Sequence, residues 1–302
     1  MHYYVFANKD SYVSSGSNRI TGETKTDQNF GQDQILEVKK EFFNDSFDYQ
    51  TRALIQFDLT KISQSTADGT ITNASYHLRL FEAEGNQEQT LEYTLLAQPL
   101  SQSWDEGVGK SGDNPKTTNG VSWENRINKP SIAALKWSGS KEGSTFPHAL
   151  GCATHSTDDS KSIQIFSNQS PDVDMDITNM TNGWLTGSHT EDKSIGMENY
   201  GLLLRFSGSQ EKDSTTFGQL KFFSKQSHTI FSPKLEVRWD DHVVATGDNT
   251  GSLPPLNVDG TEDNYLYVKR LKEEYKETDK VKFRVGARKR YIQKTFSTSV
   301  QE

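Results

Sequence analysis

The feature that most constrains this fold is the alternation of apolar and polar residues along many short segments. Val173, Met175 and Ile177 alternate with Asp172, Asp174 and Asp176, which is the clearest case. The same pattern recurs at residues 36–39, 52–58, 76–80, 91–95, 163–165, 202–206 and 235–239, and Phe222 marks a further segment. Successive side chains of a strand point to opposite faces, so each segment predicts a strand with one buried face. Many short strands separated by turn-rich gaps predict an all-β, jelly-roll-like antiparallel β-sandwich.

Two segments depart from this pattern. Leu54 interrupts the polar face of its own segment. Residues 178–185 favour a short helix, because Asp176 and Thr178 suit its N-cap region, and Met180 and Trp184 are four residues apart and share a face.

A long irregular insert separates two groups of predicted strands, from about residue 101 to residue 160. It contains Trp104, Trp123 and Trp137 among glycines and charged residues. A structureless loop of this length is uncommon in a compact domain, so we expect the insert to be packed, functional or both.

The C-terminal region predicts a second, smaller unit. Residues 1–241 form the predicted sandwich, and residues 242–262, with Pro254 and Pro255, form a linker. Strands are expected at 264–268 and 281–285. Residues 263–302 are too few for an independent domain, so we expect a partial, Ig-like β domain, either continued in a longer chain or completed by a partner.

Charge and cysteine content exclude several classes of protein. The net charge of −8 argues against nucleic acid as a partner. Cys152 is the only cysteine, so no intrachain disulfide forms. No segment has the length of a membrane span, and Met1–Ala7 lacks the features of a signal peptide. We therefore expect assembly in the cytoplasm and no membrane partner.

The sequence shows no convincing catalytic or metal-binding constellation. The three aspartates at 172, 174 and 176 fit a solvated strand face, and Asp240 and Asp241 fit a strand end. His148, Cys152 and His155 match no zinc-binding spacing. Neither a nucleophile elbow nor a phosphate-binding loop is present. We predict a protein that is not an enzyme and that uses no metal or cofactor, with a hydrolase as the weakest alternative.

Two groups of residues are candidates for binding. Trp104, Trp123 and Trp137 have the aromatic faces that stack on sugar rings, although they also suit packing of the insert. Arg284, Arg288, Lys289 and Arg290 form a basic cluster that suits a protein partner, although it also suits a solvated strand face.

Nine motifs in order resemble the DNRLRE-type β-sandwich. Among them are Asn29-Phe-Gly31, Arg52-Ala-Leu-Ile-Gln-Phe57, Trp104-Asp-Glu-Gly107, Gly120-Val-Ser-Trp123 and Asn199-Tyr-Gly-Leu-Leu203. The resemblance covers roughly residues 8–240. It implies a jelly-roll module of the kind found in surface proteins, some carbohydrate-binding modules and phage virion proteins.

The insert and the local sequence of residues 223–241 are most similar to those of structural proteins of large tailed phages. This resemblance implies a virion protein of the neck, tail or baseplate, or a capsid decoration. Such a protein acts through contacts with other virion proteins and with copies of itself. The alternative is a carbohydrate-binding module that recognises a glycan of a host or cell surface.

Overall fold

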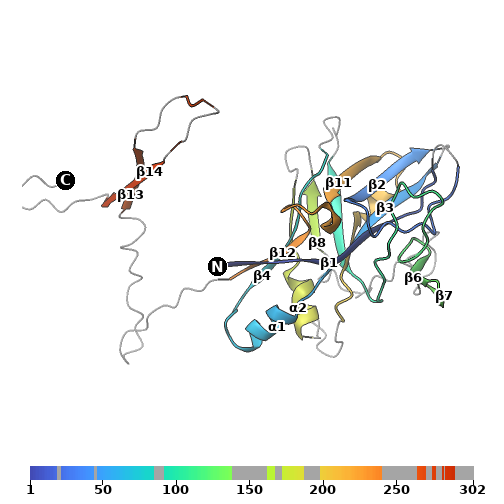
Figure 1. The fold of residues 1–302 in the computed structure, drawn as a ribbon, viewed down its shortest axis with the longest axis horizontal. Coiled ribbons are helices and arrows are strands. Elements are labelled where there is room, and N and C mark those ends of the chain that lie inside the picture. The colour runs from blue at the N-terminus through green and yellow to red at the C-terminus, as the bar shows by residue number, and fades with distance from the viewer. Residues whose placement is uncertain are drawn as a thin grey trace, which may run out of the picture. The chain divides into compact units, whose positions relative to one another are not determined.

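The computed structural model describes residues 1–18, 22–43, 46–84, 92–137, 162–166, 172–186, 198–239, 264–269, 274–276, 281 and 283–289. The chain divides into two units, Met1–Asp241 and His242–Glu302 (Figure 1). Each unit is described by itself.

Ten strands of the first unit form one hydrogen-bonded antiparallel sheet that folds into two layers. The first layer holds the start of β1 (His2–Ser14), then β12 (Lys234–Arg238), β4 (Ser75–Leu80) and β9 (Val173–Asp176). The second layer holds β8 (Ser162–Phe166), β5 (Tyr93–Pro99), β10 (Leu202–Phe206), β3 (Ser46–Phe57) and the end of β1. It is extended by β2 (Ile35–Phe43), which pairs with β3 and with β11 (Gly218–Phe223). This architecture confirms the predicted antiparallel β-sandwich.

Strand β1 belongs to both layers. Its first part pairs with β12, and its second part pairs with β3, with a register shift between Ala7 and Lys9. At the opposite edges of the sheet, Gln164 of β8 joins β9: its Nε2 donates to the Asp172 carbonyl (3.3 Å), and its Oε1 accepts from the Asp174 amide (2.9 Å). The edges of the two layers therefore cover one another, which protects them from pairing with other chains.

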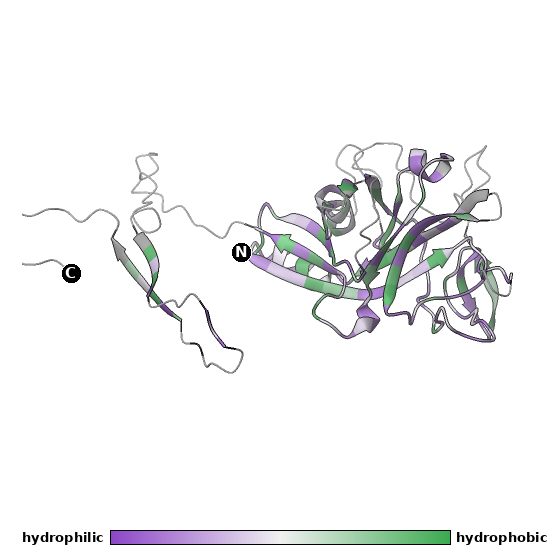
Figure 2. Cartoon of the chain, turned by 90° about the horizontal axis from the view of Figure 1, so that it is seen from above, coloured by the Kyte–Doolittle hydropathy of each residue, from purple (hydrophilic) through white to green (hydrophobic). Residues whose placement is uncertain are grey.

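The main core lies between the layers. It contains the predicted inward residues of both, including Ile55, Phe57, Leu78, Leu204 and Val237, each at most 1% exposed. The strands alternate green and purple in Figure 2, as expected where one face is buried and the other is polar.

A second cluster covers the outer face of the second layer. Val13, Leu54 and Leu203 contribute from the strands. The covering residues come from the chain between positions 100 and 137 and include Leu100, Trp104, Val121, Trp123 and Trp137. Leu54 therefore does not interrupt a solvated face, because the face it lies on is buried. The described part of the insert also forms a small hairpin of β6 (Asn125–Lys129) and β7 (Ile132–Lys136).

The buried side chain of Asn29 fixes the insert to the sandwich. Its Nδ2 donates to the carbonyls of Glu106 and Val121, each at 2.8 Å. Its Oδ1 accepts from the amides of Gly31 (3.2 Å) and Gly109 (2.8 Å). One buried side chain satisfies four backbone groups, so the Asn-Phe-Gly motif has a structural role here.

Glycine is required where the insert passes Asn29. Gly107 and Gly120 both have positive φ (82° and 120°), and a Cβ on Gly120 would lie 2.3 Å from the Cα of Gly107. The glycines of two further motifs are thus explained by close packing of the backbone.

Short helices flank the strands. α2 (Thr178–Thr186) confirms the predicted helix, and Asp176 Oδ1 accepts from the Thr178 amide (2.9 Å) at its start. α1 (Thr60–Ala67), α3 (Gly208–Lys212) and the 3-10 helix η2 (Lys225–Ser227) were not predicted. α1 and α2 lie at the same end of the sandwich (Figure 1).

The described part of the second unit is a hairpin of β13 (Asn264–Lys269) and β14 (Arg284–Lys289). The second strand begins three residues later than predicted. Leu266, Val268 and Val285 are at least half exposed. The Ig-like character of this unit stays a prediction.

Candidate functional site

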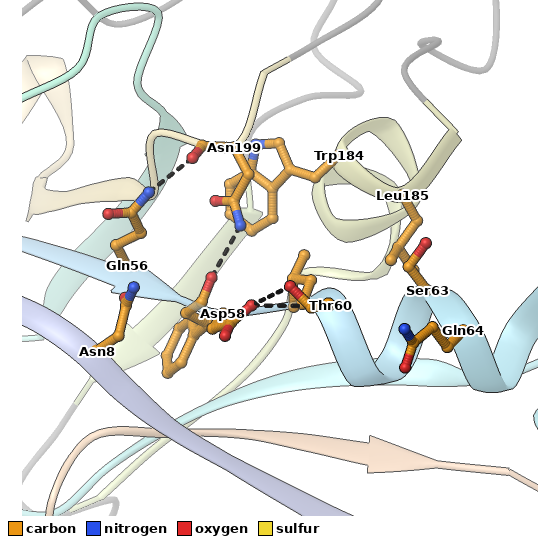
Figure 3. Close-up of a pocket in the computed structure, with 11 residues that line it drawn as sticks. Asn8, Gln56, Asp58, Thr60, Ser63, Gln64, Trp184, Leu185 and Asn199 are labelled. Carbon is orange, nitrogen blue, oxygen red and sulfur yellow. Dashed lines mark hydrogen bonds between the residues drawn. The ribbon is translucent and has the colours of Figure 1, made fainter.

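A pocket of about 510 Å³ opens between α1, α2, the end of β3 and the middle of β1, at Asn8 (Figure 3). Its polar lining comes from Asn8, Gln56, Asp58, Thr60, Ser63, Gln64 and Asn199. Trp184, Leu185, Phe57 and Leu59 supply its apolar lining. This volume lies within the range of small-molecule sites, roughly 300–1,000 Å³.

Asn199 organises one wall of the pocket. Its Nδ2 donates to the Phe57 carbonyl (2.8 Å), and its own carbonyl accepts from Gln56 Nε2 (2.7 Å), as Figure 3 shows. Its Oδ1 accepts from the amide of Gly201 (3.1 Å), whose φ of +85° suits glycine. These bonds hold the Asn199-Tyr-Gly motif beside the end of β3 and fix the orientation of the Gln56 side chain.

Asp58 forms the start of the opposite wall. Its Oδ1 accepts from the hydroxyl (2.6 Å) and the amide (3.0 Å) of Thr60, and these bonds set the entry to α1. They also lower the pKa of Asp58, the hydroxyl having the larger effect. Asp58 is therefore a carboxylate at neutral pH, and its exposed position leaves it accessible to a ligand.

Two buried polar atoms of the pocket residues have no hydrogen-bond partner among the described residues. They are Gln56 Oε1 and Trp184 Nε1. A third such atom, Thr181 Oγ1, belongs to α2 but not to the pocket lining. An unpaired buried polar group typically costs 1–3 kcal/mol, so a further hydrogen bond to either atom would be stabilising.

The arrangement suits a ligand rich in hydroxyl groups. Amides such as Asn8 and Gln64 both donate and accept, the Asp58 carboxylate accepts, and the indole N–H of Trp184 donates. Chemistry of this kind binds and orients a ligand.

The three predicted glycan-stacking tryptophans lie elsewhere, in the cluster that covers the second layer. Trp104, Trp123 and Trp137 expose only 3%, 5% and 6% of their surface. The indole N–H of Trp104 donates to the Tyr200 carbonyl (2.8 Å), and that of Trp137 to the Ser122 carbonyl (3.0 Å). Arg52 lies over the Trp123 ring, 4.8 Å from its centroid. Their rings are covered by protein, so glycan stacking by these residues stays a prediction without an accessible face to support it.

The predicted basic cluster is only partly described. Arg284 is exposed on β14, Arg288 and Lys289 lie on the same strand, and Arg290 lies outside the described residues. Its role as a partner contact stays a prediction.

The predicted solvated aspartates have distinct partners. Asp174 pairs with His77, Arg79 and Arg238 on the outer face of the first layer. Asp176 Oδ1 accepts from the Thr178 amide at the start of α2, and Asp172 Oδ1 accepts from the Glu82 amide (3.0 Å).

No three His, Cys, Asp or Glu side chains of the described residues lie close enough together to hold a metal ion. His148, Cys152, His155, Asp240 and Asp241 lie outside the described part of the chain. In that part, none of the helices has the length and apolar character needed to cross a membrane.

Part of the pocket lies in a region of the chain that is similar to a known protein family. Residues 2–128 match the model of carbohydrate-binding module family 96, over less than half of the chain. The matched region includes most of the pocket's polar lining, whereas Trp184, Leu185 and Asn199 lie beyond it. No curated protein and no solved structure matches the chain. The match supports carbohydrate binding, and it leaves the predicted phage virion role and the predicted absence of catalysis as predictions.

Sequence reasoning missed this pocket because its residues are scattered over four segments. Gln56 sits on a strand whose polar alternation gave no hint of function, and α1 carries no apolar periodicity beyond Ile62. The one available signal was Asp58 followed by Thr60, a pairing that favours a turn into a helix.

Proposed function

We propose that the first unit is a carbohydrate-binding module and that the pocket between α1 and α2 receives the sugar. The observation that carries the proposal is the pair of buried, unpartnered atoms on pocket-lining residues, Gln56 Oε1 and Trp184 Nε1, and the match of residues 2–128, which include Gln56, to a carbohydrate-binding family supports it. Sugar hydroxyls both donate and accept, so one hydroxyl can satisfy an amide oxygen and another an indole N–H.

The lining favours recognition through hydrogen bonds more than through broad stacking. Trp184 is only 8% exposed and its Nε1 is buried, so its ring offers little area for stacking. Ser63 and Gln64 are exposed on α1 and complete the polar rim. We expect modest affinity that depends on several directional contacts, since each net hydrogen bond contributes only about 1 kcal/mol.

Affinity electrophoresis in gels containing soluble β-glucan, xylan, mannan, pectin or alginate tests the proposal. We expect at least one polysaccharide to retard the full chain. Trp184→Phe and the double variant Ser63→Ala/Gln64→Ala are expected to weaken this retardation by about tenfold, which corresponds to roughly 1.4 kcal/mol. Ala67→Ser, on the same helix but outside the pocket lining, and Phe6→Ala, an exposed aromatic, serve as controls.

Two results would contradict the proposal in different ways. If no polysaccharide retards the wild-type chain, the proposed function is wrong. If retardation persists in the pocket variants and is lost in Phe6→Ala, the chain binds carbohydrate at another surface.

A further inference from the structure

Asn8, which lines the pocket, lies at the point where β1 passes from one layer to the other. Ala7 pairs with Phe57 of β3 and Lys9 pairs with Gln56, so Asn8 is an extra residue between them. A bulge of this kind takes a residue out of the strand ladder and redirects its side chain. The main chain at Asn8 therefore needs support from outside the ladder if its side chain is to keep one position in the pocket.

That support comes from Lys225 of η2. Lys225 Nζ donates to the Asn8 carbonyl (2.7 Å), and it also lies 2.7 Å from Glu106 Oε1 and 2.8 Å from Glu106 Oε2. Glu106 Oε1 accepts from the Asp10 amide (3.0 Å), and Asp10 Oδ2 accepts from the Lys225 amide (2.6 Å). Asp10, Glu106 and Lys225, here called the clamp, thus join β1, the insert and η2 beside Asn8.

The position of Lys225 is fixed by its neighbour Ser224, which is fully buried. Ser224 Oγ donates to the Asp33 carbonyl (2.6 Å) and accepts from the Gln226 amide (3.1 Å). The side chains of Lys225 and Glu106 are only 23% and 17% exposed, so their attraction is screened less than that of a surface pair. The clamp is therefore a built and partly buried feature.

The clamp contains two carboxyl groups and one ammonium group. Asp10 is 1% exposed; Glu106 faces it from the insert, Lys225 faces it from η2, and its partner on β3 is the uncharged Ile55. Burial raises the pKa of Asp10 to about 7; the Glu106 charge raises it further, whereas the Lys225 amide and charge lower it. Above that pH two buried carboxylates share one cation, and their repulsion loosens the clamp.

Resting on the function proposed above, we infer that Lys225 and Glu106 are positioning residues of the pocket, which hold the main chain of Asn8 in its binding position, and that a proton on Asp10 keeps the clamp closed. Neither Lys225 nor Glu106 is among the described residues that line the pocket. A ligand that binds Asn8 favours the closed clamp and hence the protonated form of Asp10. Affinity is therefore highest at mildly acidic pH and falls as the pH rises above about 7.

Affinity electrophoresis at about pH 6 and about pH 8, with the polysaccharide that retards the wild-type chain most strongly, tests this inference. We expect the wild-type affinity to fall about fivefold between the two pH values, because one proton is lost over this range. Asp10→Asn keeps an oxygen for the Lys225 amide but cannot ionise, so it should bind tightly at both pH values. Any other group that titrates over this range remains in Asp10→Asn, so the comparison isolates Asp10.

Lys225→Met removes the ammonium group and should weaken binding about tenfold at pH 6. Lys221→Met is the matched control. Lys221 forms an ion pair with Glu84 on β11, and its side chain is 25% exposed, close to the 23% of Lys225. This control should bind as the wild-type chain does. Urea denaturation of each variant identifies any loss of binding that comes from unfolding.

A measurement without ligand tests the clamp separately. The carbonyl carbon resonance of Asn8 reports the hydrogen bond that this carbonyl accepts. In a pH titration by NMR, we expect this resonance to shift with a midpoint near 7 in the wild-type chain, and to stay in place in Asp10→Asn. Lys225→Met should displace it at every pH.

The outcomes separate this inference from the proposed function. Wild-type affinity in Lys225→Met overturns the positioning role, and an equal pH dependence in the wild-type chain and Asp10→Asn overturns the role of Asp10. If no polysaccharide retards the wild-type chain, the proposed function is wrong. In that case an Asn8 resonance that titrates with Asp10 still supports the clamp, and one that does not move overturns it.

Discussion

Two regions of this molecule are built around buried tryptophans, and they differ in how their polar atoms are satisfied. In the cluster over the second layer, the indole N–H groups of Trp104 and Trp137 donate to backbone carbonyls. In the pocket between α1 and α2, the indole N–H of Trp184 has no partner among the described residues. Both regions bury their rings, since all three tryptophans are at most 8% exposed.

Tryptophan content therefore does not by itself locate a binding site. A Trp-rich insert suggested sugar stacking, but its hydrogen-bonding groups are used internally to attach the insert to the sandwich. A site is better indicated by a polar group that folding has desolvated and left unpaired, because its cost is recovered only when a ligand binds. The following predictions test this contrast.

The largest effect is expected at Asn29, which satisfies four backbone groups beneath the insert. Asn29→Ala should lower the free energy of unfolding by about 3–5 kcal/mol, since it leaves several buried groups unpaired. Asn128→Ala is the control: its Nδ2 makes a hydrogen bond to the Thr118 carbonyl, and about 1 kcal/mol is expected. Urea denaturation measures both. Equal losses would mean that the insert is not held by Asn29.

The next largest effect is expected at two neighbouring residues whose side chains lie on opposite faces of β10. Leu203 packs under the insert and Leu204 in the main core, and both are at most 1% exposed. Leu203→Ala and Leu204→Ala should each cost roughly 2–4 kcal/mol in the same denaturation experiment, because each opens a buried cavity. A cost below about 1 kcal/mol for Leu203→Ala alone would show that the outer face is solvated.

A smaller effect distinguishes the tryptophans directly. Trp104→Phe and Trp184→Phe remove similar volume, but only the first leaves a carbonyl, that of Tyr200, without its donor. Trp104→Phe should therefore be the more destabilising by about 1–2 kcal/mol in the ligand-free protein. The opposite order would mean that Trp184 has an internal partner and that the contrast between the regions is false.

A separate effect, measured as a slope, is a pH dependence beneath the insert. Burial raises the pKa of Asp10 from 3.8 to about 7, against the hydrogen bond donated by the Lys225 amide. The folded protein thus keeps a proton on Asp10 that the unfolded chain has lost, so the contribution of Asp10 to stability falls as pH rises from about 4 to 7. Asp10→Asn should flatten this part of the curve of unfolding free energy against pH. An unchanged slope would mean that Asp10 is already ionised in the fold.

The sandwich was predictable because its signal is local and repeated. Residues such as Val173, Met175 and Leu78 alternate with polar neighbours, so the alternation in each strand indicates its buried face without reference to the other strands. The second buried face was less visible. Leu54 showed only as an interruption, because the residues that cover it come from a distant and irregular segment.

The pocket could not be predicted because it depends on non-local geometry. Gln56 and Asn199 are far apart in the sequence, and their contact follows from the pairing of β3 with β10. No pattern in the sequence indicates that Trp184 lies beside α1, or that its N–H is unpaired. The sequence does predict α2 and its cap, which is the part of the site that depends on adjacent residues.

The most direct test of the contrast is to follow the indole N–H resonances of the five tryptophans by NMR while adding the polysaccharide that retards the chain most strongly. Single Trp→Phe variants assign the signals. We predict that the Trp184 signal shifts on binding, because its N–H gains an acceptor, while the signals of Trp104 and Trp137 stay in place. A shift of Trp104 or Trp137 with an unmoved Trp184 signal would contradict it.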